Sequence, residues 1–187
     1  MARANRVRAV AGLPRPLEPS DAEELYALVE TNRAYLSRWM PWAPSSTPVA
    51  IREFIAMGRR QLAENNGFHA ALERDGRIVG VAGFHSIDWL HRSTSIGYWL
   101  AEAEQGRGIV TQAVRELLDH AFGVWELHRV EIRAAVENAR SRAIPERLGF
   151  REEGTLRDAE LVEGRYLDLV VYSMLAPDWG KVISVAA

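Results

Sequence analysis

The sequence predicts an α+β fold in which about four helices flank a mixed, mostly antiparallel sheet of six to seven strands. The order of the segments is the first observation behind this prediction, because helical periodicity comes first and short apolar segments then alternate with helices. Turn dipeptides are the second, because they join strands near both ends of that series and so predict antiparallel hairpins. No repeat or long linker divides the 187 residues, so we expect one domain over residues 1–187.

Two helices are expected before the first strand. Ser20 and Glu23 have the spacing of a capping box, and apolar residues follow them at helical intervals, so the first helix should run to about Arg38. Thr47 followed by Pro48 predicts the start of the second helix, because proline is favoured at the first helical position.

Short apolar segments predict the strands. Residues 68–73 and 78–84 flank the turn dipeptide Asp75-Gly76 and should form a hairpin. The remaining elements are a strand at 95–101, a polar loop at 102–108, a helix from Ile109, a strand at 130–136, a short helix from Asn138 to near Gly149, and strands at about 151–157 and 165–175 joined around Glu163-Gly164.

Composition limits the classes of function. The chain has no cysteine, which excludes disulfides, zinc sites with cysteine ligands and an acyl-enzyme on a cysteine thiolate. The formal net charge of −2 gives no basis for a nucleic-acid partner, and the five histidines form no metal-binding motif. No apolar segment approaches the ~20 residues that span a bilayer, so we expect a cytoplasmic protein without a membrane partner. Residues 1–12 should form a solvated arm.

The strand, loop and helix at residues 95–123 form the unit best suited to bind an anion. Amide groups at a helix start point in one direction and favour negative charge, and glycines at Gly106 and Gly108 allow a ligand to approach the backbone closely. A Walker loop is excluded, because no Gly-Lys-Ser/Thr is present, and a dinucleotide fingerprint would need glycine where Thr111 stands. The pattern fits another kind of diphosphate loop, or a helix-entry loop that binds nothing.

The motifs around this unit resemble those of the GNAT acetyltransferase superfamily. In this chain, the segment GYWLAEAEQGRGIVTQAV is similar to motif A of the superfamily, and NARSRAIPERLGFREEG is similar to its motif B region. The segment GRYLDLVVYSML is similar to its closing strand. The amino-terminal segments LPRPLEPSDAEELYALV and ENNGFHAALERDGRIVGVAGF extend the resemblance to nearly the whole chain, which is most similar to the Rim-type amino-terminal acetyltransferases of ribosomal proteins. The resemblance implies a GNAT fold, acetyl-CoA as the donor and an amine as the acceptor, with a homodimer as a further expectation.

The resemblance also assigns residues to acetyl-CoA. The pantetheine arm should pair with the strand end at Trp99, Leu100 and Ala101, and Asn138 and Ser141 should contact the arm from the next strand's end. The diphosphate should lie on the loop and first helical turn at Gly106, Arg107, Gly108, Ile109, Val110 and Thr111. Asn138 also fits a plain helix cap. One departure is Ala103, since the superfamily loop often begins there with glutamine or arginine.

Two residues are assigned to catalysis by the same resemblance. The tyrosine that donates a proton to the thiolate in many GNAT enzymes is replaced by Pro145, whereas the serine of the Rim branch is matched by Ser141. The branch's glutamate base is matched by Glu160. Ser141 also fits a serine that satisfies backbone groups in a first helical turn, and Glu160 fits a solvated strand residue. Pro145 should kink the helix, because it cannot donate to the carbonyl of Ser141.

The acceptor site is expected among aromatic residues that include Tyr35, Trp39, Trp42, Trp89 and Tyr98. Their other explanation is core packing, since aromatic side chains bury large areas. The leading hypothesis is an enzyme that acetylates a protein or peptide amino terminus, such as that of a ribosomal protein. The alternatives are an enzyme for small amines, such as a polyamine, an antibiotic or an amino acid, and a coenzyme A-binding protein without catalysis.

Overall fold

The structure, a computed structural model, describes residues 13–186, and the arm expected at residues 1–12 lies outside them. The α-helices are α1 (Ala22–Thr31), α2 (Arg33–Leu36), α3 (Pro48–Ala63), α4 (Ile109–Gly123), α5 (Ala139–Arg147) and α6 (Ala176–Ala186). The strands are β1 (Phe68–Arg74), β2 (Arg77–Phe84), β3 (Ser93–Leu100), β4 (Arg129–Ala135), β5 (Arg151–Val162) and β6 (Arg165–Leu175). In the described part of the chain, no helix has both the length and the apolar content needed to cross a membrane.

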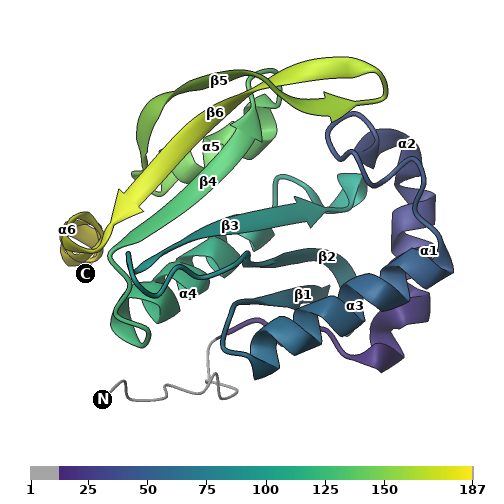
Figure 1. The fold of residues 1–187 in the computed structure, drawn as a ribbon, viewed down its shortest axis with the longest axis horizontal. Helices are drawn as coiled ribbons and strands as arrows, with labels where there is room; N and C mark the ends of the chain where they lie inside the picture. The colour runs from purple at the N-terminus through teal and green to yellow at the C-terminus, as the bar shows by residue number, and fades with distance from the viewer. Residues whose placement is uncertain (1–12, 187) are drawn as a thin grey trace.

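The six strands form one sheet in the order β1-β2-β3-β4-β6-β5 (Figure 1). Neighbouring strands are antiparallel except β3 and β4, which are parallel. The predicted α+β fold with a mixed, mostly antiparallel sheet is therefore confirmed. The two predicted hairpins are the β1–β2 and β5–β6 pairs at the two edges of the sheet.

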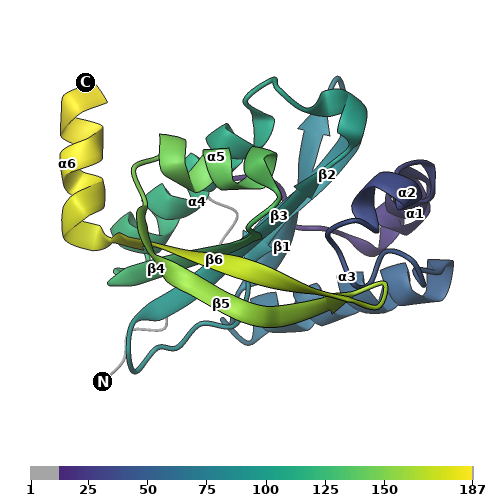
Figure 2. The ribbon, with the colours of Figure 1, turned by 90° about the horizontal axis from the view of Figure 1, so that it is seen from above.

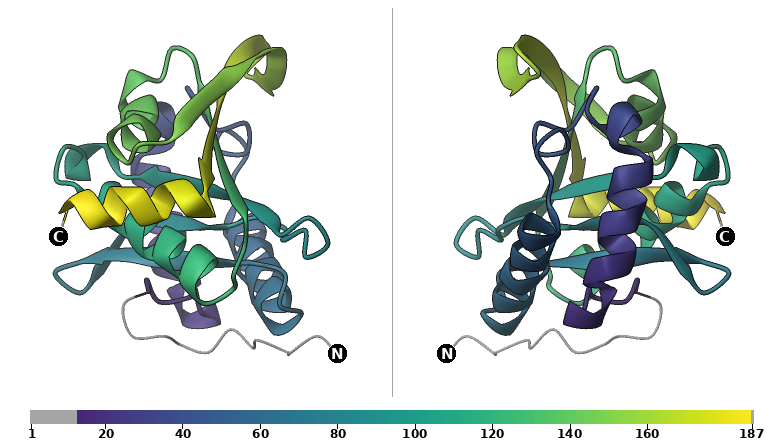
Figure 3. Two further views of the ribbon diagram at one scale, coloured as in Figure 1. Left: turned by 90° about the vertical axis from the view of Figure 1, so that its left-hand side faces the viewer. Right: turned by 90° about the vertical axis from the view of Figure 1, so that its right-hand side faces the viewer.

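Helices cover both faces of the sheet (Figures 2 and 3). Each face has its own buried core. On one face, Leu117 of α4 belongs to the same buried cluster as Phe84 of β2. On the other, Leu25 of α1 and Ile55 of α3 cluster with Val81 of β2. Since β2 is covered on both sides, it is buried along almost its whole length, as its continuous apolar sequence requires.

The helices differ from the prediction at both ends of the chain. The first predicted helix is divided at Asn32, whose side-chain amide donates to Leu28 O at 2.9 Å and whose Oδ1 accepts the Glu102 N–H at 3.0 Å. Because this side chain bonds to a distant loop, the helix is interrupted, and it ends at Leu36 rather than Arg38. With α6 added after β6, residues 13–186 contain six α-helices instead of about four.

The cap of the first helix also differs from the prediction. Ser20 does not cap it, because a 3₁₀ turn at Pro19–Asp21 precedes α1. The Asp21 carboxylate accepts the Glu18 N–H at 2.7 Å and pairs with Arg15 at 2.8 Å, so this ion pair fixes the entry to α1.

Two other predicted helix starts are confirmed. The Thr47 side chain accepts the Ala50 N–H at 3.1 Å at the start of α3, where Pro48 is the first helical residue. Asn138 Oδ1 accepts the Ser141 N–H at 3.2 Å at the start of α5. Asn138 is therefore a helix cap, whatever else it binds.

The parallel strands β3 and β4 separate soon after they begin. Only residues 93–95 pair with residues 129–131, and β3 then continues to Leu100 while β4 continues to Ala135 (Figure 1). The side of β3 that faces β4 therefore has unpaired backbone groups along its second half. Such a free strand edge can bind an extended ligand as an added strand.

Candidate functional site

Two cavities open on either side of the point where β3 and β4 separate. The first, of about 780 Å³, we name the glycine-loop cleft; it is lined by the second half of β3, residues 105–112 and α5. The second, of about 750 Å³, we name the hairpin cleft; it is lined by α3, β3, β4 and the β5–β6 hairpin. The two cavities share part of their walls, namely Trp39, Met40, Tyr98, Trp99, Asn138 and Ser141. A long ligand in the first cleft can thus meet a second ligand in the other.

The loop between β3 and α4 has the geometry that an anion site needs. Gly106 and Gly108 have φ values of +75° and +78°, a conformation that residues other than glycine seldom adopt. A Cβ at either position would meet no protein atom within 4 Å, so the space in front of the loop is open. Gly108 precedes α4 without a side-chain cap, and the helix therefore presents the amides of its first turn to that space.

Several cations surround this loop, although they come from different elements. Arg107, which the sequence assigned to the diphosphate, forms an ion pair with Glu104 at 3.3 Å, and Arg74 of β1 pairs with the same carboxylate at 2.6 Å. Arg140 and Arg147 of α5 line the cleft from the opposite side. Arg147 donates to the Thr111 hydroxyl at 3.0 Å and so links α5 to the first turn of α4.

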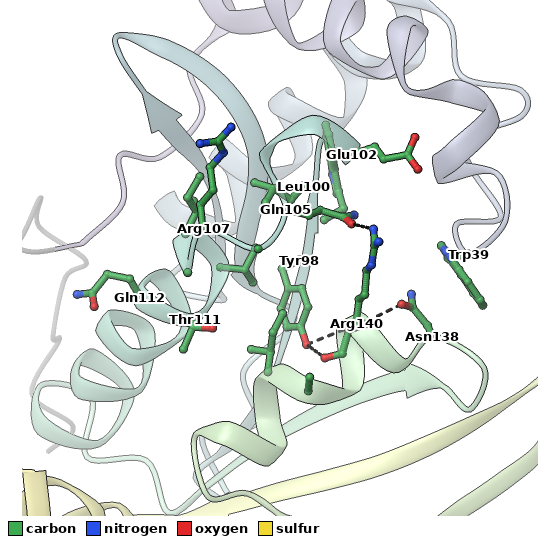
Figure 4. A pocket seen from close by; sticks show the side chains of 18 of the residues that line it. Trp39, Tyr98, Leu100, Glu102, Gln105, Arg107, Thr111, Gln112, Asn138 and Arg140 are labelled. Carbon is green, nitrogen blue, oxygen red and sulfur yellow. Dashed lines mark hydrogen bonds between the residues drawn. The ribbon is translucent and has the colours of Figure 1, made fainter.

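Figure 4 shows that Arg140 also reaches across the glycine-loop cleft to Gln105. The Gln105 amide in turn donates to the Tyr35 hydroxyl, so that α5, the loop and α2 are connected by side chains. Tyr35 thereby belongs to the glycine-loop cleft and not to the hairpin cleft. No sequence pattern predicts this chain of hydrogen bonds, because its three members come from separate segments.

Tyr98 and Ser141 meet where the two clefts join. The Tyr98 hydroxyl donates to the Ser141 carbonyl oxygen at 2.9 Å, and the Ser141 hydroxyl lies 3.4 Å from the Tyr98 oxygen. Pro145 explains the first contact, because a proline four residues later cannot donate to that carbonyl and leaves it free for the phenol. The helix is continuous through Pro145 to Arg147. Burial raises the pKa of Tyr98, so its hydroxyl remains protonated at neutral pH.

The hairpin cleft contains one carboxylate and one guanidinium among its described lining residues, Glu160 and Arg133. Glu160 lies where the β5–β6 register shifts, opposite Leu167, and no described residue forms an ion pair or hydrogen bond with its side chain. Partial burial raises the pKa of the Glu160 carboxyl above its ordinary value. This is the change that a carboxylate base needs in order to act nearer neutral pH.

The remaining aromatic candidates separate into three groups. Trp39 lines both clefts, and Trp42 lines the hairpin cleft, where its ring lies 5.9 Å from that of Trp99. Trp89 lines neither cleft, because its indole packs 6.1 Å from Trp125 and donates to Asn65 O at 2.9 Å. Its assignment to the acceptor site was therefore wrong.

Most of the residues that the sequence assigned to the cofactor come together. The glycine-loop cleft is lined by Trp99, Leu100, Gly106, Arg107, Gly108, Ile109, Val110, Thr111, Asn138 and Ser141. Ala101 is the exception, since it is buried and its N–H donates to Val79 O at 2.8 Å. The sequence missed His69 and His85 in the hairpin cleft, because no spacing along the chain relates residues of β1 and the end of β2 to this cavity.

Comparisons with known proteins agree with this geometry. The model of the GNAT acetyltransferase domain matches residues 13–151. The putative ribosomal N-acetyltransferase YdaF of Bacillus subtilis is 46% identical, over 88% of this chain and 91% of its own. The ribosomal-protein-serine acetyltransferase of Escherichia coli is 30% identical, over 81% of this chain and 85% of its own.

Solved structures show the same fold. RimL, an α-N-protein acetyltransferase of ribosomal L7/L12 that was solved with coenzyme A, matches with a TM-score of 0.84 and 26% identity, over 92% of this chain and 98% of its own. The glycine loop, the separated strands and these matches agree on one cofactor, acetyl-CoA. The chain belongs to the GNAT family of acetyltransferases.

Proposed function

We propose that this enzyme transfers the acetyl group of acetyl-CoA to the α-amine of a protein or peptide amino terminus. The junction of the two clefts at Tyr98 and Ser141 is the observation that carries the proposal. Acetyl-CoA would occupy the glycine-loop cleft, with its diphosphate on the amides of Gly108 to Thr111 and its pantetheine arm along the free edge of β3. Its thioester would then lie at the junction, open to an amine from the hairpin cleft.

The chemistry requires three proton transfers. The ammonium of the acceptor loses one proton before its nitrogen attacks the carbonyl carbon, the nitrogen loses a second as the amide forms and the C–S bond breaks, and the departing thiolate gains one. We assign the first proton to Glu160 and the proton of the thiolate to the Ser141 hydroxyl, as the resemblance implied, and Ser141 recovers its proton from the one that the nitrogen releases. An α-ammonium has a pKa of about 8, so a weak base can deprotonate it. A lysine ammonium, with a pKa of about 10.4, needs a stronger base. The partly buried carboxylate of Glu160 therefore suits an amino-terminal acceptor better than a lysine.

The acceptor class follows from the charges and from the relatives. A polyamine carries several positive charges and would need several carboxylates, but Glu160 is the only one among the described residues of the hairpin cleft. The relatives named above as ribosomal N-acetyltransferases support a ribosomal-protein amino terminus, and hence a cytoplasmic enzyme. The hairpin cleft argues against a coenzyme A-binding protein without catalysis, because such a protein would need only the glycine-loop cleft. The homodimer stays a prediction.

An acetyl-CoA turnover screen with thiol release as the readout tests this proposal. Peptides with a free amino terminus should be acetylated with a kcat/KM about tenfold or more above that of spermidine. The same peptides with a blocked amino terminus and an internal lysine should show little turnover, which separates α-amines from lysine. Equal or faster turnover of spermidine would contradict the α-amine assignment, and no turnover with any amine would contradict the enzyme.

Replacing Glu160 with glutamine should lower kcat/KM for a peptide about tenfold at pH 7. The loss should shrink toward pH 8.5, because a growing fraction of the α-amine is then neutral without help. In the wild type, activity should fall as the pH drops through the raised pKa of Glu160, since a protonated carboxyl accepts no proton. A pH profile of kcat/KM checks both. Glu163→Gln at the exposed hairpin turn is the matched control and should retain the wild-type profile.

A further inference from the structure

One end of the hairpin cleft carries polar side chains that the proposed reaction does not use. His69, His85 and Arg133 line the cleft near the place where β3 and β4 are still paired. Glu160, by contrast, lies beyond the carboxyl end of β4. The last residue of β4, Ala135, pairs with Leu169 of β6, whereas Glu160 pairs with Leu167, two residues past that point. The junction of Tyr98 and Ser141 belongs to the same cavity. We name the group formed by His85 and Arg133 the donor end.

The position of His85 is fixed by β3. Its Nδ1 lies 2.9 Å from the Ser95 hydroxyl, and its backbone N–H donates to Ser95 O at 2.9 Å. The imidazole lies over Gly97, since a Cβ there would come within 2.9 Å of Nε2. Glycine at 97 therefore makes room for this ring one residue before Tyr98.

Arg133 lies on the neighbouring strand, just past the section that pairs with β3. Ser95 pairs with Glu131, and Gly97 and Arg133, each two residues further along its own strand, lie on the same strand faces as these two residues and both line the hairpin cleft. Arg133 Nε donates to Glu131 at 2.7 Å, which orients the guanidinium and leaves its terminal nitrogens for another partner. His85, which follows β2 and lies over Gly97 of β3, and Arg133 of β4 thus both line the cleft.

The charges around the donor end keep the imidazole neutral. Burial lowers the pKa of His85, and the charge of Arg133 lowers it further. His69, whose ring lies 6.3 Å away, has a pKa that burial lowers to about 4, so it adds no charge at pH 7. Tyr98 stays protonated, and Glu160 is the only carboxylate among the described residues of the cleft. The described lining of the cleft therefore has the Glu160 carboxylate at one end and, at the other, the guanidinium of Arg133, which forms an ion pair with Glu131.

We propose that His85 and Arg133 are specificity-determining hydrogen-bond donors that bind the carbonyl oxygen next to the acceptor's α-amine. In this proposal the Ser95 hydroxyl donates to Nδ1, which leaves the proton on Nε2, the nitrogen that lies over Gly97 in the lining of the cleft. An acceptor of the class N–Cα–C=O then has its ammonium drawn toward Glu160 and its carbonyl oxygen toward the donor end. Amines without that carbonyl lose these hydrogen bonds, and a polyamine also places a second cation near Arg133. This inference rests on the proposed function and narrows it.

Two acceptors and four variants test the proposal. The acceptors are an alanyl peptide amide and the same compound with a methylene in place of its first carbonyl group. His85→Asn keeps a polar atom where Nδ1 meets Ser95 but removes the donor at Nε2, whereas His85→Gln brings an amide to the Nε2 position. Arg133→Gln removes the charge, and His91→Asn, an exposed histidine outside the cleft, is the matched control.

We expect the wild type to prefer the carbonyl-containing acceptor, and His85→Asn to reduce that preference about tenfold, mainly through KM. His85→Gln should keep more of it than His85→Asn, and His91→Asn should keep all of it. Arg133→Gln should reduce the preference and raise the relative turnover of spermidine. Nitrogen chemical shifts of His85 should show the proton on Nε2.

Three results would overturn the donor end. The preference could be the same in His85→Asn as in the wild type, His85→Gln could lose more of it than His85→Asn, or the proton could reside on Nδ1. Each leaves acetylation of the peptide intact and so contradicts the donor end alone. A wild type that acetylates no amine would overturn the proposed function and the donor end together.

Discussion

Replacing Gly108 with valine should weaken the binding of coenzyme A by about a hundredfold or more. Gly108 has a φ of +78°, which costs a β-branched residue on the order of 1–3 kcal/mol, and this strain is added to a steric effect. The valine side chain would project into the open space where the diphosphate is expected, since no protein atom lies within 4 Å of a Cβ at this position. Calorimetric titration with coenzyme A measures the loss.

Gly123→Val is the control for this experiment. Gly123 is the last residue of the same helix, α4, and is exposed. A Cβ at this position would also meet no atom within 4 Å, but the φ of Gly123 is not in the left-handed region. Coenzyme A should bind Gly123→Val as it binds the wild type. The melting temperature of each free protein shows whether the fold survives. Wild-type affinity in a folded Gly108→Val protein would contradict the assignment of the loop to the diphosphate.

Replacing Ser141 with alanine should lower kcat about a hundredfold while the affinity for coenzyme A changes little. The fold around residue 141 depends on backbone groups that alanine keeps, because its N–H donates to Asn138 and its carbonyl accepts from Tyr98. The variant therefore removes the hydroxyl at the cleft junction without removing the contacts that position α5. Single-turnover kinetics with saturating acetyl-CoA separate the chemical step from binding.

Ser86→Ala is the matched control, since Ser86 is exposed and lines neither cleft. Tyr98→Phe complements the experiment, because it keeps the ring and removes the second hydroxyl at the junction. If Ser141→Ala retains the wild-type kcat and Tyr98→Phe loses it, the tyrosine and not the serine gives the proton to the thiolate. If both retain it, the proton comes from solvent.

The order of the elements and the glycine loop before α4 could be predicted because their signals are local. Thr47 and Asn138 cap helices by bonding to amides three residues later, so a short sequence window contains both partners. Gly106 and Gly108 are needed for their own backbone conformations, which the residue type alone reveals. The two hairpins follow from turn dipeptides between strands that are adjacent in the chain.

Errors arose where a partner outside the local motif decided the structure. Asn32 divides the first helix because its side chain bonds to Glu102 across the fold. Ser20 lost the cap because Arg15 holds Asp21 in place at the entry to α1. Trp89 was assigned to the acceptor site by residue type, whereas packing against Trp125 places it elsewhere. None of these partners lies at a spacing that periodicity can detect.

The sequence by itself determined the α+β class and the glycine loop at the start of α4, and the resemblance supplied the predicted residues for acetyl-CoA and catalysis. Only the tertiary structure decided how the reacting groups meet. Because β3 and β4 part after three residue pairs, two clefts form and join at Tyr98 and Ser141. The carbonyl that Pro145 frees binds a phenol 43 residues away in the chain, and Arg133 of β4 lines the same cleft as His85. Such contacts depend on the register and divergence of strands, which side-chain patterns along one strand do not encode.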